Sequence, residues 1–466
     1  MSRNRIIKLI ISLIYIVCTI IFIFKVNSMN IIPNKYLLLG IVILVVLNII
    51  SILCLIVKNK WLKIITILIY LVLSIIYIFG IKYINKTNSF INKTFVNNEI
   101  ESVKINYLLV SKNKYTEKDL YYEDIYYDKN DDHVDDAIIE LNKKYSSNMK
   151  SIDPSDELYK KDVFFISDFM YDELQENGKI NPNDYNILYK VELEIKVDKE
   201  DTDTKKKDIY NIYLAARDFS GYRVDLNKVI TVNTKTKEIL ITNINRFSYL
   251  DIEDMGKNRL SSTGYYGVLY NKNAIEKELG IEIDYYFSID TKSLVKLVDA
   301  IGGIEYCSDQ SYTTTHALIL DSYDDSKGEK FHVKKGCQHL NGIETLTVAR
   351  ERNAFKDWIT QRERNCTAIM EDILNSAKKP SNITRYPNIL DSMEGMYKTN
   401  IPKDTILYSI KSLLNDKWTF NTQEIDGEYG TNSICFGRER GYVYYLDKKS
   451  TEKASKAIND LYNKTK

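Results

Sequence analysis

Four arginines lie close together in one stretch of the chain: Arg350, Arg352, Arg362 and Arg364. The apolar run 346–349 precedes them, and we interpret it as a buried strand that continues to residue 352. On a strand, Arg350 and Arg352 would project to the same side. Guanidinium groups repel one another unless an anion lies among them, and their planar forks hold phosphate oxygens bidentately. The stretch therefore predicts a phosphate site; the alternative is a surface ion-pair network with Glu351 and Glu363.

Arginines and carboxylates also follow the ends of expected strands earlier in the chain. They are Arg217, Asp218, Arg223 and Asp225 after the expected strand 209–215, and Arg246 after the expected strand 238–244. Strand ends carry the ligand-binding loops of α/β folds. One interpretation is that Asp218 and Asp225 hold Mg²⁺, or alternatively Mn²⁺, while the arginines grip diphosphate oxygens, because Mg²⁺ accepts carboxylate and phosphate oxygens together. The other is that the carboxylates only neutralise the arginines.

Residues 208–466 show the alternation of strands and helices that positions such loops. The expected strands are 209–215, 229–232, 238–244 and 285–289, and three of the expected helices are 274–279, 406–414 and 452–462. Asp290 or Thr291 can cap a further helix, which buries Val298 and Ile301 and ends at Gly302. This alternation predicts an α/β class unit with helices on both faces of a central mixed sheet.

The first 84 residues differ from the rest of the chain. Three apolar runs, Ile6 to Phe24, Tyr36 to Val57 and Ile64 to Ile81, are each close to the ~20 residues that cross a bilayer. Buried core helices would carry a polar face, so we predict a membrane anchor of three transmembrane helices at residues 1–84. Basic residues flank the first run and crowd the second loop, which places the N-terminus in the cytoplasm. With three spans, the chain beyond Lys82 then lies outside.

Residues 85–207 are polar and rich in tyrosine, with expected strands at 100–111, 162–166 and 186–197 and a helix at 135–145. We predict a small α+β accessory domain here. The run 198–207 has no apolar side chain to bury and separates this domain from the next. Over the whole chain, 64 lysines and arginines nearly balance 63 aspartates and glutamates, so bulk charge does not favour nucleic acid as a partner.

The six cysteines fall into two groups. Cys18 and Cys54 lie inside apolar runs and read as small buried hydrophobes. The other four follow the membrane anchor, an even number in a compartment that permits disulfides: Cys307, Cys337, Cys366 and Cys435. Sequence alone leaves three connectivities open. We favour Cys307 with Cys337, because they bracket an expected strand, loop and strand, and Cys366 with Cys435 is then the remaining pair.

Four segments of residues 208–466 resemble motifs of the LytR-CpsA-Psr cell-wall phosphotransferases. They are 229–237 followed by Arg246, then 280–286, 297–304, and 335–342 leading into Arg350 and Arg352. Residues 85–207 are similar, through weaker motifs, to the accessory domain of the capsule-type branch. The motifs are specific in combination, and through them the chain resembles this family.

The resemblance implies an enzyme anchored in the cytoplasmic membrane of a Gram-positive bacterium, with its C-terminal domains outside. It would transfer an anionic glycopolymer, teichoic-acid-like or capsular, from a polyprenyl-diphosphate lipid to peptidoglycan. By position, Asp218 and Asp225 correspond to the family's metal-binding aspartates. Together with Arg246 they are the implied catalytic residues. The implied diphosphate-binding residues are Arg223, Arg246, Arg259, Arg350, Arg352 and Arg362.

The chemistry that we expect is direct phosphoryl transfer without a covalent enzyme intermediate. A sugar hydroxyl of peptidoglycan attacks the sugar-linked phosphorus and polyprenyl phosphate leaves, while arginines and Mg²⁺ stabilise the developing charge. Asp225 could alternatively accept the hydroxyl proton. The lipid tail requires an apolar tunnel between sheet and helices, which the apolar strands would line.

The chain departs from the family pattern at Ala216, Phe219 and Ser220, which replace a glycine, a serine and an arginine around Asp218, and at three further positions. Phe247 stands where the family has an acid after its arginine, so that Asp251 or Asp254 would have to replace it. Cys366 stands in place of a glutamine and Ile359 in place of an acid. These departures keep two other functions open: a surface protein that binds the lipid diphosphate without chemistry, and a hydrolase that releases polymer from its carrier.

Overall fold

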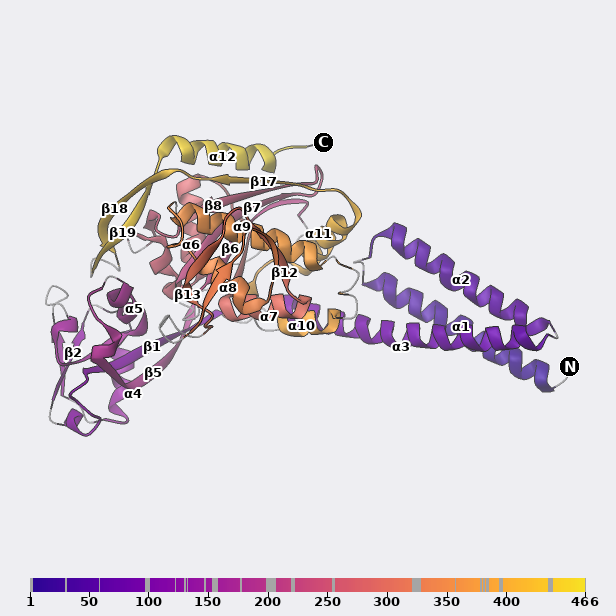
Figure 1. The fold of residues 1–466 in the computed structure, drawn as a ribbon, viewed down its shortest axis with the longest axis horizontal. Coiled ribbons are helices and arrows are strands. Elements are labelled where there is room, and N and C mark those ends of the chain that lie inside the picture. The colour runs from indigo at the N-terminus through magenta and orange to yellow at the C-terminus, as the bar shows by residue number, and fades with distance from the viewer. Residues whose placement is uncertain are drawn as a thin grey trace.

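A computed structural model of the chain shows three parts in sequence order: a bundle of apolar helices, a small sheet unit and a larger layered unit (Figure 1). The structure describes residues 3–465 with gaps at 30–31, 58, 97–100, 122, 130, 132, 146–147, 153–157, 177, 198–206, 219–222, 254–255, 321–327, 357, 378, 380–381, 383–384, 394–396 and 435–438. The predicted linker 198–207 therefore lies almost entirely outside the described residues.

The three N-terminal helices are α1 (Arg3–Ser28), α2 (Asn34–Ile56) and α3 (Lys60–Val96). Each is long and apolar enough to cross a membrane, as the apolar runs predict. Polar side chains bind the helices together where they meet. The rings of Tyr15 and Tyr70 stack with centroids 4.0 Å apart, and Asn48 Nδ2 donates to Thr19 Oγ1 at 2.9 Å. The outward-facing side chains are apolar and exposed, as expected for a surface that faces lipid.

Helix α3 runs past the domain boundary that we placed after residue 84. Its 37 residues span about 56 Å, well beyond the ~30 Å hydrocarbon core of a bilayer. The last turns contact the large unit: Lys86 pairs with Asp391 of α10 (Tyr386–Met393), and Phe90 lies against Tyr397 with ring centroids 6.2 Å apart. The last membrane helix is thus continuous with a segment that packs against the large unit.

The accessory unit is a five-stranded sheet with two helices. Its strands are β1 (Glu101–Lys112), β2 (Asp124–Asp128), β3 (Asn148–Ile152), β4 (Val163–Ser167) and β5 (Tyr185–Val197), in the order β3-β2-β4-β1-β5. The helices are α4 (Val134–Asn142) and α5 (Asp168–Glu176). Its core contains Tyr107, Phe164 and Phe165, all almost fully buried. The expected strands and helix are present, and the unit has the predicted α+β character.

The large unit is built on a six-stranded sheet in the order β16-β11-β6-β7-β8-β17. The strands are β6 (Ile209–Arg217), β7 (Val224–Asn233), β8 (Glu238–Ile244), β11 (Tyr285–Asp290), β16 (Tyr397–Thr399) and β17 (Thr419–Glu424). Strands β11 and β6 pair in parallel, as do β17 and β8, and the other pairs are antiparallel. The predicted mixed sheet is confirmed.

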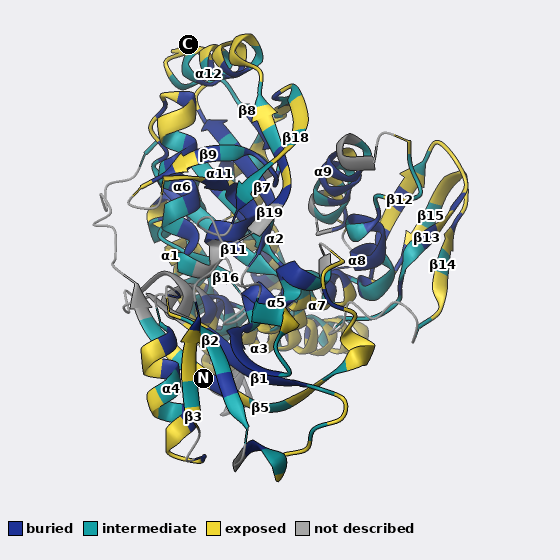
Figure 2. Ribbon diagram, turned by 90° about the vertical axis from the view of Figure 1, so that its left-hand side faces the viewer, coloured by how far each residue is buried: buried dark blue, intermediate teal, exposed yellow. Residues whose placement is uncertain are grey.

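Helices cover both faces of this sheet (Figures 1 and 2). On one face lie α6 (Val268–Leu279) and α12 (Lys448–Tyr462), packed on side chains such as Tyr213 and Val229. On the other face lie α7 (Thr291–Ile301), α8 (Gly342–Arg350), α9 (Trp358–Ala377) and α11 (Lys403–Asn415). Asp290 caps α7 by accepting from Ser293 N at 2.7 Å, and Gly302 ends it at φ 83°, as predicted.

Four short strand pairs complete the large unit: β9 (Tyr249–Ile252) with β10 (Gly256–Arg259), β12 (Ile304–Ser308) with β15 (Gly336–Leu340), β13 (Tyr312–Ala317) with β14 (Lys330–Val333), and β18 (Gly427–Ile434) with β19 (Glu439–Leu446). Cys307 and Cys337 are directly opposite on β12 and β15 and form the predicted disulfide. The remaining predicted pair is wrong for Cys366, a buried free thiol; Cys435 lies outside the described residues.

The strand that we predicted before Arg350 is wrong, because residues 342–350 form helix α8. Asn341 and Glu344 make a reciprocal capping box: each side chain accepts from the other residue's backbone N–H, at 3.0 and 2.8 Å. Such a box starts a helix. The apolar run then turns along the helix, and Arg350 is its last residue. Arg350 and Arg352 are therefore brought together by a helix end and the loop after it, and not by strand alternation.

Candidate functional site

Asp225, the second residue of β7, is the centre of the charged cluster. Its Oδ1 accepts from Arg246, which follows β8, and its Oδ2 accepts from Arg362 Nη2 of α9 at 3.0 Å. Arg362 Nη1 also donates to the Asp225 carbonyl at 3.1 Å. Burial alone would raise the pKa of Asp225, but the positive charges of Arg246, Arg362, Arg352 and Arg223 hold that pKa well below its usual range. Asp225 is thus a carboxylate held between two arginines from different elements.

Arg350 and Arg352 reach the cluster from the end of α8. Arg350 Nη1 donates to the Ile319 carbonyl at 3.3 Å, and the charge of Arg352 acts on Asp225. Glu351 between them is fully buried and holds the loop, because its Oε1 accepts from the N–H groups of Arg352 and Ala354 at 3.0 and 2.9 Å. The alternative of a surface ion-pair network with Glu351 does not describe this stretch, since Glu351 fixes backbone that presents the arginines.

Asp218 and Arg223 close the loop between β6 and β7. The Asp218 N–H donates to the Arg223 carbonyl at 3.0 Å, and the Arg223 N–H donates to Asp218 Oδ1 at 3.4 Å. Both side chains are almost fully buried. Asp218 thereby lies at the same edge of the sheet as Asp225, as the strand-end argument predicts, while residues 219–222 lie outside the described part of the chain.

Arg223 and Arg259 share a partner that sequence reasoning missed. Glu173 of α5, in the accessory unit, pairs through Oε1 with Arg259 Nη2 and, at 3.3 Å, with Arg223 Nε. The Glu173 side chain has no exposed surface, and the two arginine side chains are each 2% exposed. The only local signal was helical periodicity: Glu173 falls on the same face of α5 as the buried Phe169 and Met170.

Phe247, the departure from the family pattern, lies between two of the arginines. Its ring centroid is 4.8 Å from the guanidinium carbon of Arg246 and 5.4 Å from that of Arg259. The face of the aromatic ring attracts both guanidinium cations. Phe247 therefore interacts with the arginines through its ring, at the position where the family has a carboxylate. Asp251 does not replace the acid, because it forms an exposed pair with Lys277 at 2.6 Å. Asp254 lies outside the described residues.

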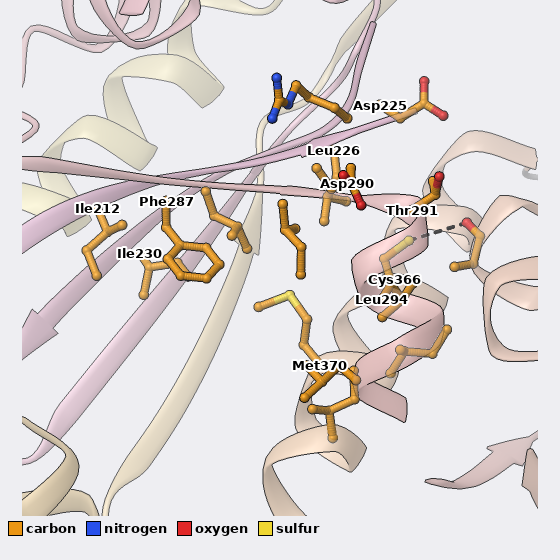
Figure 3. A pocket seen from close by; sticks show the side chains of 18 of the residues that line it. Ile212, Asp225, Leu226, Ile230, Phe287, Asp290, Thr291, Leu294, Cys366 and Met370 are labelled. Atoms are coloured by element: carbon orange, nitrogen blue, oxygen red, sulfur yellow. Dashed lines mark hydrogen bonds between the residues drawn. The ribbon is translucent and has the colours of Figure 1, made fainter. Parts of the chain in front are cut away.

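An apolar tunnel of about 460 Å³ leads from the charged cluster into the space between the sheet and the second helix layer (Figure 3). Arg217, Asp225, Arg350 and Arg362 line its charged end. Further along, β6, β7, β11, α7, α9 and α11 contribute apolar side chains, among them Ile212, Ile230, Phe287, Leu294, Met370 and Ile410. Among the described residues, five predicted site residues do not belong to this lining: Asp218, Arg223, Arg246, Arg259 and Arg352. An apolar space between the sheet and the helices is present, lined by the apolar strands as predicted.

Cys366 of α9 also lines the tunnel, where the family pattern has a glutamine. Its Sγ donates to the Ala349 carbonyl at 3.4 Å, and burial raises the pKa of the thiol to about 11. A thiol with that pKa stays protonated at neutral pH, so it acts as an apolar wall residue and not as a nucleophile. Ile359, another departure, is the second residue of α9, and its side chain lies outside the described part of the structure.

The described residues contain no group of three or more His, Cys, Asp or Glu side chains placed to hold a metal ion. Two carboxylates, Asp218 and Asp225, do lie at one sheet edge beside the arginines. Mg²⁺ commonly takes one or two carboxylates together with substrate phosphate oxygens and waters. The donor set therefore fits Mg²⁺ when a diphosphate is present, and both oxygens of Asp225 are engaged by arginine without one.

Comparison with known proteins shows the family of the chain. Residues 172–460 match the model of the LytR_cpsA_psr family. A teichoic acid transferase of Bacillus licheniformis, polyisoprenyl-teichoic acid–peptidoglycan teichoic acid transferase TagU, is 28% identical over 253 residues, covering 53% of this chain and 75% of that protein. TagU of Bacillus cereus is 26% identical over 221 residues, covering 46% and 68%.

Among solved structures, the crystal structure of B. subtilis TagV is 22% identical, with a TM-score of 0.46, and the match covers 56% of this chain and 100% of that one. The family model itself extends over more than half of the chain and includes the second half of α5, the whole central sheet and every arginine of the cluster. The chain therefore belongs to the LytR-CpsA-Psr family.

Proposed function

We propose that this protein transfers an anionic glycopolymer, teichoic-acid-like or capsular, from a polyprenyl-diphosphate lipid to peptidoglycan. One observation carries the proposal: an apolar tunnel ends at a cluster of arginines around Asp225. A long isoprenoid tail needs an apolar space, and a diphosphate needs paired cations. The tunnel offers both to one molecule. The names of the relatives, teichoic acid transferases, support the same substrate class.

The diphosphate is expected at the charged end of the tunnel. Arg217, Arg350 and Arg362 line that end, and Arg246 lies across Asp225 from Arg362. A diphosphate carries more negative charge than Asp225 and offers more oxygens. It would therefore compete with Asp225 for the guanidinium groups of Arg246 and Arg362, which are already directed toward an anion. The arginines need little rearrangement to bind it, which lowers the free-energy cost of binding.

The other end of the tunnel lies toward the membrane anchor, which gives the lipid a short path. Ile406, Ile410 and Leu413 of α11 line the tunnel, and α11 lies beside the end of the membrane helices (Figure 1). Lys35 Nζ at the start of α2 donates to the Asn415 carbonyl at the end of α11, at 2.8 Å. We infer that the isoprenoid tail extends from the bilayer past α11 while its diphosphate stays among the arginines.

In the proposed reaction, a sugar hydroxyl of peptidoglycan forms a bond to the sugar-linked phosphorus. The bond from that phosphorus to the oxygen of polyprenyl phosphate breaks, and the hydroxyl proton is lost to solvent. Arginines aimed at the diphosphate stabilise the charge that develops on the leaving oxygen. Because the pKa of Asp225 is held low, it is a weak base, and we assign it to orienting Arg246 and Arg362. Bound Mg²⁺ at Asp218 and Asp225 would add positive charge at the diphosphate.

This function requires the large unit to lie outside the cytoplasmic membrane of a Gram-positive bacterium, where peptidoglycan is. The basic residues around α1 and in the loop after α2 support a cytoplasmic N-terminus. Protease added to intact protoplasts should digest the chain beyond α3 and leave a cytoplasmic control protein whole. Protection of that part under the same conditions would contradict this orientation.

The direct test is transfer by the purified full chain in lipid nanodiscs. A radiolabelled lipid-linked teichoic-acid precursor is mixed with a peptidoglycan oligosaccharide, with Mg²⁺ or with chelator. We expect label on the oligosaccharide, and less of it with chelator. Label released as free polymer would favour the hydrolase alternative. Tight lipid binding without product under every metal condition would favour the protein that only binds.

A further inference from the structure

The accessory unit reaches into the arginine cluster through one side chain. Glu173 of α5 has no exposed surface, and it pairs with Arg223 and Arg259 of the large unit. These arginines come from the loop before β7 and from the end of β10. One carboxylate of the accessory unit thus neutralises two arginines that come from different elements of the large unit.

A series of contacts extends from Glu173 to the charged end of the tunnel. Arg259 pairs with Glu173 and lies over one side of Phe247, and Arg246 lies over the same ring. Arg246 then pairs with Asp225. The Arg259 guanidinium is further held by Ser262, whose hydroxyl accepts from its Nε at 3.2 Å. A displacement of Arg259 would therefore change the position of Arg246 through the ring that they share.

The environment of Glu173 is poorly suited to a purely stabilising role. A buried ion pair contributes little net stability unless every polar atom is satisfied. Glu173 Oε2 is buried and accepts no hydrogen bond within the described part of the chain. An apolar residue of similar volume could pack α5 in place, but it would leave the buried Arg223 and Arg259 without their shared anion. We therefore interpret the Glu173 carboxylate as a group that fixes the positions of the Arg223 and Arg259 guanidinium groups.

The accessory unit is docked firmly enough to deliver a side chain accurately. Ile434 of β18 and Val443 of β19 are fully buried in the accessory core, and Tyr249 and Tyr266 of the large unit pack against it. A shared core resists relative motion, because close-packed side chains cannot slide without opening voids. Glu173 is therefore held by a rigid element.

We propose that Glu173 is a positioning residue for glycopolymer transfer, so that the accessory domain forms part of the transfer site. This inference rests on the proposed function. Glu173 lies away from the tunnel lining and acts through Arg259, Phe247 and Arg246. Its loss should reduce the rate of the chemical step while leaving the grip of Arg350 and Arg362 on the lipid nearly unchanged.

The experiment measures kcat and KM for the lipid-linked donor with the full chain in nanodiscs. The variants are Glu173→Gln, which keeps shape but removes charge, Arg259→Lys, and the two combined. Glu192→Gln is the matched control, because Glu192 is an accessory-domain carboxylate in an exposed pair with Lys104. We expect each test variant to lower kcat by about 10- to 100-fold, the effect of displacing a catalytic group by about 1 Å, with KM within about threefold. The control should match wild type.

The combined variant separates a shared role from two independent ones. If both residues act through one contact, Glu173→Gln with Arg259→Lys should be no slower than the slower single variant. The inference is overturned if folded Glu173→Gln keeps kcat within about twofold of wild type, or if the single effects multiply in the combined variant. If Glu173→Gln does not fold, wild-type kcat in Arg259→Lys overturns it. Wild-type protein without transfer overturns the proposed function and, with it, this inference.

Discussion

The arginines of the cluster form two groups that differ in partner and in surroundings. Arg350 and Arg362 line the tunnel, and Arg362 shares with Arg246 a carboxylate, Asp225, whose side chain is 21% exposed. Arg223 and Arg259 are sealed behind them and share Glu173, which has no exposed surface. The first pairing can be exchanged for a ligand, because water and solutes reach Asp225. The second cannot be exchanged without opening the contact between the two units.

The difference shows that residue type does not define the role of an arginine in this site. Both groups match positions that the resemblance assigns to diphosphate binding. A guanidinium contributes to ligand affinity only where its donors face the ligand. In a sealed pair the same group contributes through its position, and its loss leaves a buried carboxylate without a partner. We therefore expect substitutions in the two groups to affect different measured quantities.

The largest effect is expected for Asp225→Ala. Arg246 and Arg362 would lose the anion that holds them together, and because Asp225 is 21% exposed the loss of folding stability should be below the roughly 3–5 kcal/mol typical of a fully buried pair. Transfer should fall by at least about 100-fold, the loss seen when a group that stabilises the transition state is removed. Activity and chemical denaturation of the same sample measure both. Asp251→Ala is the control, because Asp251 forms an exposed pair with Lys277, and it should change folding stability by less than about 1 kcal/mol. If Asp251→Ala loses as much stability and activity as Asp225→Ala, Asp225 does not hold the arginines as we describe.

Lipid affinity should separate the two groups of arginines. Arg362→Ala removes a charge-assisted contact at the charged end of the tunnel and should weaken binding of the polyprenyl diphosphate by about 1.5–3 kcal/mol, or roughly 10- to 150-fold. Arg259→Ala should change that affinity by less than about threefold, because its side chain points into a sealed pair. Binding of a labelled lipid diphosphate to nanodisc-held protein gives both values. Equal losses of affinity would show that the comparison is mistaken.

The apolar part of the tunnel should matter for lipids with long tails. Ile230→Trp places a larger side chain in the tunnel and should weaken binding of a long-chain polyprenyl diphosphate by about tenfold, since overpacking costs about 1–3 kcal/mol. A diphosphate with a single isoprene unit should bind the variant as it binds wild type. Competition between the two compounds on one preparation measures this. If both lose affinity together, the tail does not occupy this part of the tunnel.

The smallest expected effect is on pH dependence. The pKa of Asp225 in the folded protein is depressed, so its contribution to stability is complete above the unfolded pKa of about 3.9 and disappears as pH falls through the folded value. The difference in unfolding free energy between wild type and Asp225→Asn should stay constant from about pH 8 to pH 5 and shrink below about pH 4. Denaturation curves at these pH values test it. A difference that already shrinks between pH 8 and pH 6 would mean that the carboxylate is not held by arginines.

Much of the fold could be predicted from the sequence because its signals are local. Apolar runs indicated the three membrane helices, Asp290 and Gly302 marked the two ends of α7, and the strands flanking Asp225 and Arg246 were recognisable from apolar character. Cys307 and Cys337 were paired correctly, because they lie on neighbouring strands of one local hairpin-like segment. Each of these features depends on residues close together in the chain.

The errors arose where two local signals competed. The apolar run before Arg350 favours a strand, although Asn341 and Glu344 have the spacing of a capping box, which favours a helix. Cys366 was paired by elimination, but its place on the buried face of α9 keeps it a free thiol. Composition and even cysteine counts say nothing about which face of a helix a side chain occupies.

The sequence by itself determined which residue types were available for the site: arginines after strand ends, two aspartates, and apolar strands to line a tunnel. Only the tertiary structure decided how the arginines divide between tunnel and interior, because that division depends on burial and on partners far away in the chain. Glu173 and Arg259 are 86 positions apart in the chain, with strands β5 to β9 between them, yet both are sealed in one contact. Long-range burial of this kind leaves little local trace, since an acid on an apolar helix face becomes interpretable only when its cationic partners are known.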